Sequence, residues 1–470
     1  MVKYTDNING YLDADGNEFA FNVANQHVTI LPVQNSQNEK NIVIDQFKRN
    51  YDQLPDYFEG IDDQFFRVAI FRNPNKVIKP NIRYPSFHFM TPLIIKAAGN
   101  ASGLFDKMPE PWNKFHAITF YGGNINSIYD PAISIEQPTT AEIFSGFDRN
   151  EIKFRSWKDY SKSINCNIDE EKAEFSISVL NTGDKNDPDK MEAYSLGERN
   201  SYIQLTFEKS QDFSSIKKYF NIIRKLVAIL TKQNNVTFNT YLCQRNTDGL
   251  LYRTAYCYIF DPYDNYSKRR PYKVIPLDEF LFYVPEFIEK IQSNVFNPLI
   301  TLLPDNNKDA YRISITNVQD LCTALEIAYG FEREKREKDQ VIEALKKEIK
   351  KTIKDFLSRQ EINIDINRQT NMSSSFQYLS FTLKEKIFTL YNENKEIINR
   401  ITNKMRLHNL TYEDVVAFVD LRNNKTHSGI IEWGNAADYY EPLLALVYIC
   451  YFKEIGISEE LISNLLDNLF

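Results

Sequence analysis

The spacing of apolar residues changes about two thirds of the way along the chain, and this change constrains the fold more than any other feature. Before about residue 310, apolar and aromatic residues come in short alternating runs separated by Pro, Gly and Asn. After residue 314 they recur every three or four positions. Strands repeat every two residues and helices every 3.6. The sequence therefore predicts an α+β protein, with a β-rich N-terminal domain followed by an all-α helical bundle.

The N-terminal region, residues 1–310, carries several strand signals. Asp15-Gly16 is a favoured tight-turn pair between two strand-like runs and predicts a hairpin. A helix is expected over 216–230, capped by Ser214 or Ser215. These signals favour a sandwich or barrel-like β domain with a sensory or regulatory role. An exposed loop is expected over 181–190. The region either forms one domain or divides into two subdomains near residue 210. Further strands are expected over 26–33, 65–71, 116–121, 173–180, 202–208, 236–242 and 251–260.

The C-terminal region, residues 314–470, is predicted to be an antiparallel helical bundle. One or two helices over 277–303 precede it, and the expected domain boundary lies near the polar run 304–309. The bundle helices are expected over 318–333, 334–359, 383–406, 411–427 and 436–454, with a short tail helix from Ser458.

Composition narrows the class of protein. The chain has 470 residues, 43% of them hydrophobic, which is enough apolar surface for packed cores. Its net charge of -7 means that RNA contact requires a local basic patch. With no apolar leader and no run of about 18 to 20 apolar residues, we expect a cytoplasmic protein without a membrane partner. The five cysteines are too scattered for zinc ligation or a disulfide framework, so we expect buried thiols and no metal or cofactor.

The expected helix over 411–427 contains the residues best suited to chemistry. Thr411 can cap it, with Asp414 three residues on in a variant of the capping box. Val415, Phe418, Val419 and Arg422 follow at spacings of three and four, so Arg422 lies on or beside the apolar face. A guanidinium there is costly unless it meets an anion or lines a cleft. His427 is expected in the last turn, before Ser428-Gly429.

Arginine and histidine together suit the cleavage of RNA by its own 2′-hydroxyl. The reaction needs a base, an acid and a cation for the phosphate, and it needs no metal. Histidine serves as acid or base near neutral pH, and arginine binds phosphoryl oxygens with two parallel hydrogen bonds. The spacing alone also arises by chance, and a histidine at a helix end is often only a capping residue.

The surrounding sequence adds a resemblance. Leu421-Arg-Asn-Asn-Lys-Thr-His-Ser-Gly resembles the R-x4-6-H signature of HEPN domains, in which a polar residue, often Asn, follows the arginine. Thr323-Ala-Leu-Glu326 in the first helix, the helix order and the last helix resemble the Apea-like HEPN branch. The resemblance covers the last ~155 residues well, and the preceding region loosely resembles the N-terminal companion domain found in anti-phage proteins.

The resemblance implies a metal-independent HEPN endoribonuclease, an RNA-binding hydrolase that acts as a homodimer with its Arg/His pairs facing each other. By motif match, Arg422 and His427 are catalytic and Asn423 supports them. Lys425 either supports the site or is simply solvated. Glu326 either orients the arginine or is an ordinary ion-pair partner. The implied role is a latent antiviral nuclease of abortive infection, restrained by its N-terminal region until a phage-derived trigger binds there.

Charged residues elsewhere offer weaker candidates. Lysines at 347, 350, 351 and 354 (Lys347, Lys350, Lys351, Lys354) share one helix face and are candidate RNA contacts, although interleaved glutamates also fit a solvated face. An acidic cluster at 56, 59, 62 and 63 is read as a solvated loop rather than a cation site. His88 is expected to be a core or half-buried residue, and His27, His116 and His408 have no partners at metal or triad spacing.

Three rival interpretations remain open. The bundle is a catalytically silent HEPN module that binds a nucleotide or docks a partner, with the N-terminal domain carrying the function. Alternatively, it accepts a nucleotidyl group or modifies a nucleotide. In the third, the protein is purely sensory and has a structural helical tail, so that changing His427 costs nothing.

Overall fold

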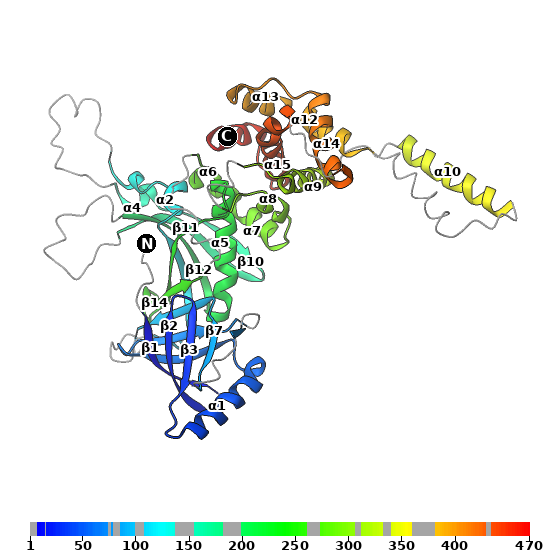
Figure 1. Cartoon of the computed structure of the whole chain (residues 1–470). Helices are drawn as coiled ribbons and strands as arrows, with labels where there is room; N and C mark the ends of the chain where they lie inside the picture. Colours follow the sequence, from blue (N-terminus) through cyan, green and yellow to red (C-terminus); the bar gives the residue numbers. More distant parts are fainter. Residues whose placement is uncertain are drawn as a thin grey trace, which may run out of the picture. The chain divides into compact units, whose positions relative to one another are not determined.

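The computed structural model describes most of the chain and divides it into two compact units, Met1–Ser293 and Asn294–Phe470 (Figure 1). The described residues are 7–14, 16–73, 77–78, 85–98, 108–136, 155–181, 199–260, 273–305, 312–331, 340–359, 381–428 and 434–470. The predicted loop over 181–190 lies outside these ranges except for Asn181. Each unit is described by itself below.

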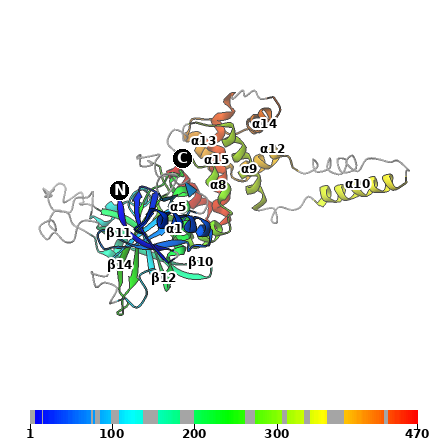
Figure 2. The same cartoon turned by 60° about the horizontal axis from the view of Figure 1, so that its bottom comes forward.

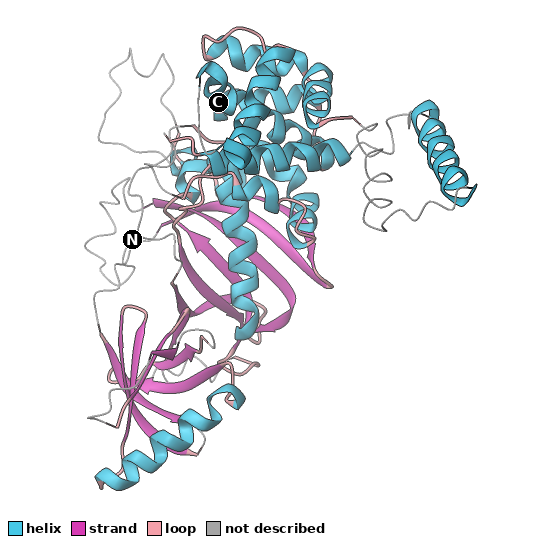
Figure 3. Ribbon diagram, turned by 45° about the vertical axis from the view of Figure 1, so that its right-hand side comes forward, coloured by secondary structure: helices cyan, strands magenta, loops and turns pink. Residues whose placement is uncertain are grey.

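The strands of the first unit form one antiparallel sheet of 14 strands in the order β10-β11-β12-β9-β13-β14-β8-β5-β4-β1-β2-β3-β7-β6 (Figure 3). A sandwich would divide the strands between two sheets, so the single sheet corrects that expectation. The strands are β1 Ile8–Ala14, β2 Asn17–Ala24, β3 His27–Pro32, β4 Tyr57–Asp62, β5 Arg67–Phe71, β6 Val77–Ile78, β7 Phe87–Met90, β8 Leu93–Ala97, β9 Lys114–Tyr121, β10 Lys162–Ile168, β11 Glu171–Asn181, β12 Arg199–Asp212, β13 Asn239–Arg245 and β14 Leu251–Ile259.

The first half of the sheet, β1 to β8, packs against helix α1, Gln37–Asn50. The predicted hairpin is confirmed: β1 pairs with β2 from Ile8–Val23 to Ala14–Asn17, and Gly16 adopts φ +70° at the turn. Helix α1 was not predicted. Its Phe47 lies at the centre of an aromatic cluster with Phe19, Phe58 and Phe87, at ring-centroid distances of 5.1 to 5.7 Å.

The second half of the sheet packs against helix α5, Ile216–Thr231, which confirms the predicted helix. Tyr219 of α5 contacts Phe207 of β12 at 4.6 Å between ring centroids. Asp212, rather than a serine, accepts the hydrogen bond from the backbone N–H of Ser214 at this corner. Residue 210, near which the sequence left a subdomain break open, lies inside β12.

Shorter helices complete the first unit. They are α2 Ile125–Ile128, α4 Trp157–Tyr160, α6 Leu277–Phe280 and α7 Val284–Gln292, with 3-10 turns η1 Tyr51–Gln53, η4 Pro131–Ser134, η7 Phe213–Ser215 and η8 Leu281–Tyr283. Helix α7 packs against both α5 and β10. The predicted helices over 277–303 are therefore present, but they belong to both units.

The unit boundary lies between Ser293 and Asn294, earlier in the chain than the polar run at 304–309. Helix α8, Asn297–Thr301, packs against α9 of the second unit. Phe296, at the start of α8, is fully buried and contacts Tyr451 at 5.3 Å between ring centroids. This contact packs the segment against the helical core of the second unit. The polar run in the sequence therefore does not mark the boundary between the units.

The second unit is helical, and α15 runs through its centre (Figure 2). Helix α9 packs against α15, α12 and α14. Residues 440 and 442–452 of α15 are all buried, which is the pattern of a helix surrounded by others. The helices are α9 Ile315–Phe331, α10 Gln340–Arg359, α12 Leu383–Glu393, α13 Lys395–Lys404, α14 Tyr412–Ser428, α15 Tyr440–Glu454 and α16 Glu459–Leu469, with the 3-10 turn η11 Gly434–Tyr439.

The predicted helix over 383–406 is two helices that meet at Asn394. The Asn394 side chain is buried and donates to the Leu390 carbonyl, four residues back, where it competes with the helical backbone. The expected helical bundle is otherwise present. Within the described ranges, no helix combines the length and the apolar character needed to cross a bilayer.

Candidate functional site

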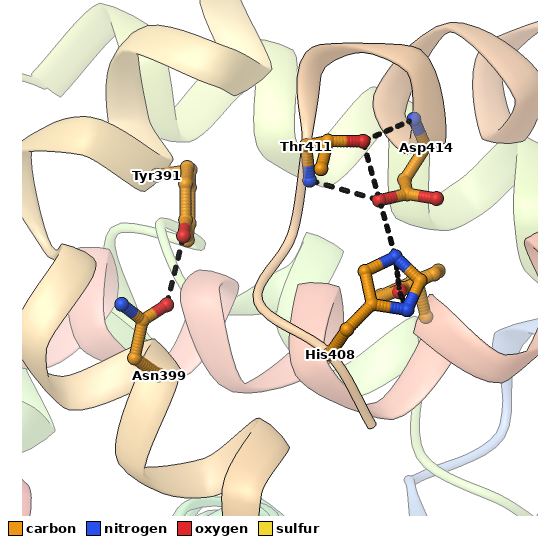
Figure 4. A network of polar contacts seen from close by, with 6 residues as sticks. Tyr391, Asn399, His408, Thr411 and Asp414 are labelled. Atoms are coloured by element: carbon orange, nitrogen blue, oxygen red, sulfur yellow. Dashed lines mark hydrogen bonds and ion pairs between the residues drawn. The ribbon is translucent and has the colours of Figure 1, made fainter.

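Helix α14 begins in a closed set of hydrogen bonds around Asp414 (Figure 4). The Asp414 Oδ2 atom accepts from the Thr411 N–H at 2.9 Å and from the Thr411 hydroxyl at 2.6 Å. The Thr411 Oγ1 atom in turn accepts from the Asp414 N–H at 3.2 Å. This reciprocal pair confirms the predicted capping box and satisfies donors that a helix start leaves unpaired.

His408 joins the same carboxylate and was not identified from the sequence. Its Nε2 atom lies 3.1 Å from Asp414 Oδ2, and the Tyr439 hydroxyl lies 2.9 Å from its Nδ1 atom. The same hydroxyl also lies 2.5 Å from Nε2. Because a carboxylate only accepts, the contact with Asp414 requires a proton on Nε2. The side chain of His408 is still 64% exposed. The network therefore joins the loop before α14 to η11, which ends at Tyr439.

The acid–base properties of this network follow from its contacts. Desolvation raises the pKa of Asp414, but the hydrogen bonds from Thr411 and His408 outweigh it and the pKa is lowered overall. The pKa of Tyr439 is raised to about 12, first by desolvation and then by the negative charges of Asp414 and Asp438. At neutral pH the network thus consists of a carboxylate and a protonated phenol, and neither is poised to transfer a proton.

One hydrogen bond and one ion pair connect neighbouring helices of the second unit. The Tyr391 hydroxyl of α12 donates to Asn399 Oδ1 of α13 at 2.8 Å, across the break at Asn394 (Figure 4). Lys384 of α12 lies 2.8 Å from the carboxylate of Asp420 on α14, and this ion pair joins α12 to α14.

Arg422 lies in the second half of α14 and is half-buried, as its spacing from Phe418 and Val419 predicted. Its positive charge acts on the buried thiol of Cys322 in α9. Burial raises the pKa of that thiol to about 12, Arg422 lowers it and Glu326 raises it. Arg422 of α14 and Glu326 of α9 thus act on the same thiol, and the two helices pack against each other.

Glu326 makes a direct ion pair with a different cation. Its Oε1 atom lies 2.5 Å from Lys386 Nζ of α12, and its side chain is 46% exposed. The sequence left two roles open for Glu326, orienting the arginine or forming an ordinary ion pair. The contact with Lys386 is an ion pair of the ordinary kind. A pairing with Lys386 was not predicted, because residues 60 positions apart give no spacing signal.

The remaining residues of the motif lie in the same helix. Asn423 is exposed. The backbone is helical through Lys425 and His427 to Ser428, but the side chains from 424 onward lie outside the described residues. Because they are five positions apart in the chain, Arg422 and His427 are separated by about 140° around the helix axis and by about 7.5 Å along it. The four lysines of α10, Lys347, Lys350, Lys351 and Lys354, are exposed.

The acidic cluster at 56, 59, 62 and 63 was predicted to be a solvated loop, but one of its members, Asp62, is buried. Asp62 accepts from the N–H groups of Gln64 and Phe66, and lies 2.7 Å from Lys96 Nζ. It therefore organises the turn between β4 and β5. In the described part of the chain, no group of three or more His, Cys, Asp or Glu residues is placed to hold a metal ion.

His88 and His116 both make hydrogen bonds to neighbouring strands of the first unit. His88 is half-buried between Thr29 Oγ1 at 3.0 Å and Ser86 Oγ at 2.9 Å, which confirms its predicted position, and desolvation lowers its pKa. His116 is buried, and its Nδ1 atom accepts from the Arg245 N–H at 3.3 Å.

Comparison with protein-family models, with curated proteins and with solved structures found no match for this chain.

Proposed function

We propose that the second unit is a metal-independent endoribonuclease of the HEPN type, in which α14 carries the reacting groups. Arg422 binds the scissile phosphate, His427 transfers protons and Asn423 supports them. The single observation that supports this most is the position of Arg422. A half-buried guanidinium, at the contact with α9 and beside an exposed amide, is held in place by packing.

The chemistry is an attack of the ribose 2′-oxygen on the neighbouring phosphorus. A base takes the 2′-hydroxyl proton, the new P–O bond forms, and the bond to the 5′-oxygen breaks as an acid protonates the leaving oxygen. The products are a 2′,3′-cyclic phosphate and a 5′-hydroxyl. Two parallel hydrogen bonds from a guanidinium stabilise the charge that develops on the phosphoryl oxygens.

Helix geometry supports a dimeric site. Because the positions of Arg422 and His427 are separated by about 140° around one helix, a single copy does not direct both toward one phosphate. Two copies of α14 facing each other across a two-fold axis bring an arginine of one copy toward a histidine of the other. We therefore expect the active species to be a homodimer and its substrate to be single-stranded RNA.

The biological role that we propose is abortive infection against phage, with the first unit restraining the nuclease until a phage-derived trigger binds. This part rests on the order of the two units and on the resemblance of the second unit to HEPN nucleases. Bacteria that express the chain should then show new RNA ends only after phage challenge.

The test is cleavage of single-stranded RNA in EDTA, with mapping of the product ends, in extracts of challenged and unchallenged cells. Wild type should produce 5′-hydroxyl and cyclic-phosphate ends. Arg422→Ala should lower the rate by about 100-fold or more, because one preorganised donor to the developing charge is lost. Arg422→Lys should not restore it, since an ammonium lacks the paired geometry.

Arg400→Ala is the matched control. Arg400 is an exposed arginine of α13 that pairs with Asp467 and Ser463, and its loss should leave cleavage within about twofold. Cleavage that needs a divalent metal, or that survives Arg422→Ala, would count against the proposal. Protection against phage by a variant without any cleavage would favour a silent module that binds a nucleotide or a partner.

A further inference from the structure

One face of the sheet in the first unit carries a row of tyrosines across β12, β9, β13 and β14. Tyr202 lies opposite Tyr121, and Tyr241 lies opposite Tyr256. The rings of Tyr121 and Tyr241 are 5.5 Å apart between centroids. Neighbouring strands and alternate residues place all four on the same side of the sheet.

Helix α5 packs on the opposite side of these strands. Phe120 and Phe220 both stack on Phe238, and Phe220 belongs to α5. Phe120 alternates with Tyr121 along β9, so the two point to opposite faces. Toward the first half of the sheet, the tyrosine face continues through Tyr258, which pairs with Ile94 of β8 and packs against the core of that half.

A β-bulge brings an arginine onto this face. The pairing shifts by one residue at Thr254, so that Leu242 faces Ala255 while Cys243 faces Arg253. Arg253 and Tyr256 are three residues apart and would otherwise point to opposite faces. The Arg253 guanidinium instead lies over both rings, 5.7 Å from the centroid of Tyr241 and 4.8 Å from that of Tyr256.

The charge on this face differs from that of the chain. The whole chain has 63 acidic residues and a net charge of -7. The same-face positions on the four strands include one acidic residue, Glu208 near the end of β12, and two basic residues, Arg245 and Arg253. Within the described residues no carboxylate pairs with Arg253, whereas nearby Lys96 is paired with Asp62. The same-face positions are Asn200, Tyr202, Gln204, Thr206, Glu208, Ala117, Thr119, Tyr121, Asn239, Tyr241, Cys243, Arg245, Leu251, Arg253, Tyr256 and Tyr258.

We propose that this face, centred on Tyr241, Arg253 and Tyr256, is a stacking platform for single-stranded nucleic acid. Tyr256 is 37% exposed and Arg253 is exposed, so both offer a flat surface to an unpaired base. Aromatic rings and a guanidinium plane bind bases by stacking, and the free positive charge attracts the phosphates. A platform of this kind does not depend on base sequence, because every base has a flat face.

The inference is independent of the proposed nuclease. It concerns binding by the first unit, and it holds whether or not α14 cleaves RNA. The test therefore uses the full chain with a fluorescent 12-nucleotide 2′-O-methyl RNA, which lacks the hydroxyl needed for cleavage. The DNA oligonucleotide of the same sequence and the corresponding RNA duplex form the other two arms.

Wild type should bind both single strands at least tenfold more tightly than the duplex, because stacking requires unpaired bases. Binding of both single strands, or of the RNA strand alone, supports the platform. The comparison of the two strands shows whether the platform accepts DNA as well as RNA. Tyr256→Ala and Arg253→Ala should each weaken binding by about tenfold, and Tyr256→Phe should retain it within about twofold. In an Arg422→Ala, His427→Ala background, which removes the proposed nuclease site, Tyr256→Ala should still weaken binding by about tenfold.

Tyr252→Ala is the control on the same strand. Tyr252 is 42% exposed but faces Gln244 and so lies on the other side of the sheet. Its loss should leave affinity unchanged, and thermal unfolding should show that all variants fold. Equal binding of strand and duplex, no binding by wild type, or an equal loss in Tyr252→Ala and Tyr256→Ala would overturn the proposal.

Discussion

The two ends of helix α14 are built differently. At the first end the polar groups contact one another: Asp414 accepts from Thr411 and from His408, and His408 is hydrogen-bonded to Tyr439. The second end carries Arg422, half-buried against α9, with an exposed Asn423 next to it. The hydrogen bonds at the first end satisfy groups that a helix start leaves unpaired and so stabilise the fold, whereas the second end carries the residues that we propose for catalysis.

The comparison separates two histidines that look alike in the sequence. His408 lies just before α14, and His427 lies in the last turn of α14. The contacts of His408 assign it to the entry of α14, and the motif places His427 at its end. We therefore expect stability to depend on the first end and catalysis on the second.

The largest expected effect on stability comes from Asp414→Ala. It removes the capping box and leaves His408 without its carboxylate, which should lower the free energy of unfolding by about 1–2 kcal/mol. Urea unfolding of the full chain, followed by far-UV circular dichroism, measures it. Glu413→Ala, one residue earlier and exposed, is the control and should cost less than about 0.5 kcal/mol. If Asp414→Ala and Glu413→Ala lowered the free energy of unfolding equally, the stabilising role of the network at the first end of α14 would be contradicted.

The contribution of Asp414 should also depend on pH. Because its pKa is lowered in the folded chain, its charge stabilises the fold above the unfolded pKa of about 4, and this stability is lost as the pH falls through the folded value. The difference in unfolding free energy between wild type and Asp414→Asn should therefore be constant from pH 5 to pH 7 and should shrink below about pH 4. A difference that grows on acidification would contradict the geometry.

The smallest effect is expected at the cysteines. All five are buried, and burial raises the pKa of Cys166 to about 11 and that of Cys322 to about 12, so almost no thiolate exists at neutral pH. A disulfide exchange reagent should label fewer than one thiol per native chain and five after denaturation. Rapid labelling of Cys322 in the native chain would mean that the contact between α9 and α14 opens easily.

The sequence predicted the elements whose signals are local. Asp15-Gly16 gave the hairpin, the apolar spacing gave α5, and Thr411 with Asp414 gave the start of α14. Helix α1 was missed because it is short of apolar residues: only Ile44 and Phe47 of its 14 residues are buried. The capping box of Ser36 and Glu39 was the available signal for it.

The contacts that define the candidate sites join distant parts of the chain, and no spacing rule reveals them. Tyr439 is 31 residues from His408, and Lys386 is 60 from Glu326. The platform depends on strand register and on one bulge at Thr254, which decide the face on which Arg253 lies. Residues on one helix can be grouped from the sequence, whereas residues brought together by the sheet cannot.

The most direct measurement compares His427→Ala with His408→Ala in the cleavage of single-stranded RNA in EDTA, with product ends mapped. We predict that His427→Ala lowers the rate by about 100-fold or more and abolishes the 5′-hydroxyl ends, while His408→Ala stays within about threefold of wild type. Equal rates in wild type and His427→Ala, or a greater loss in His408→Ala, would contradict the assignment of the reacting groups to the second end of α14.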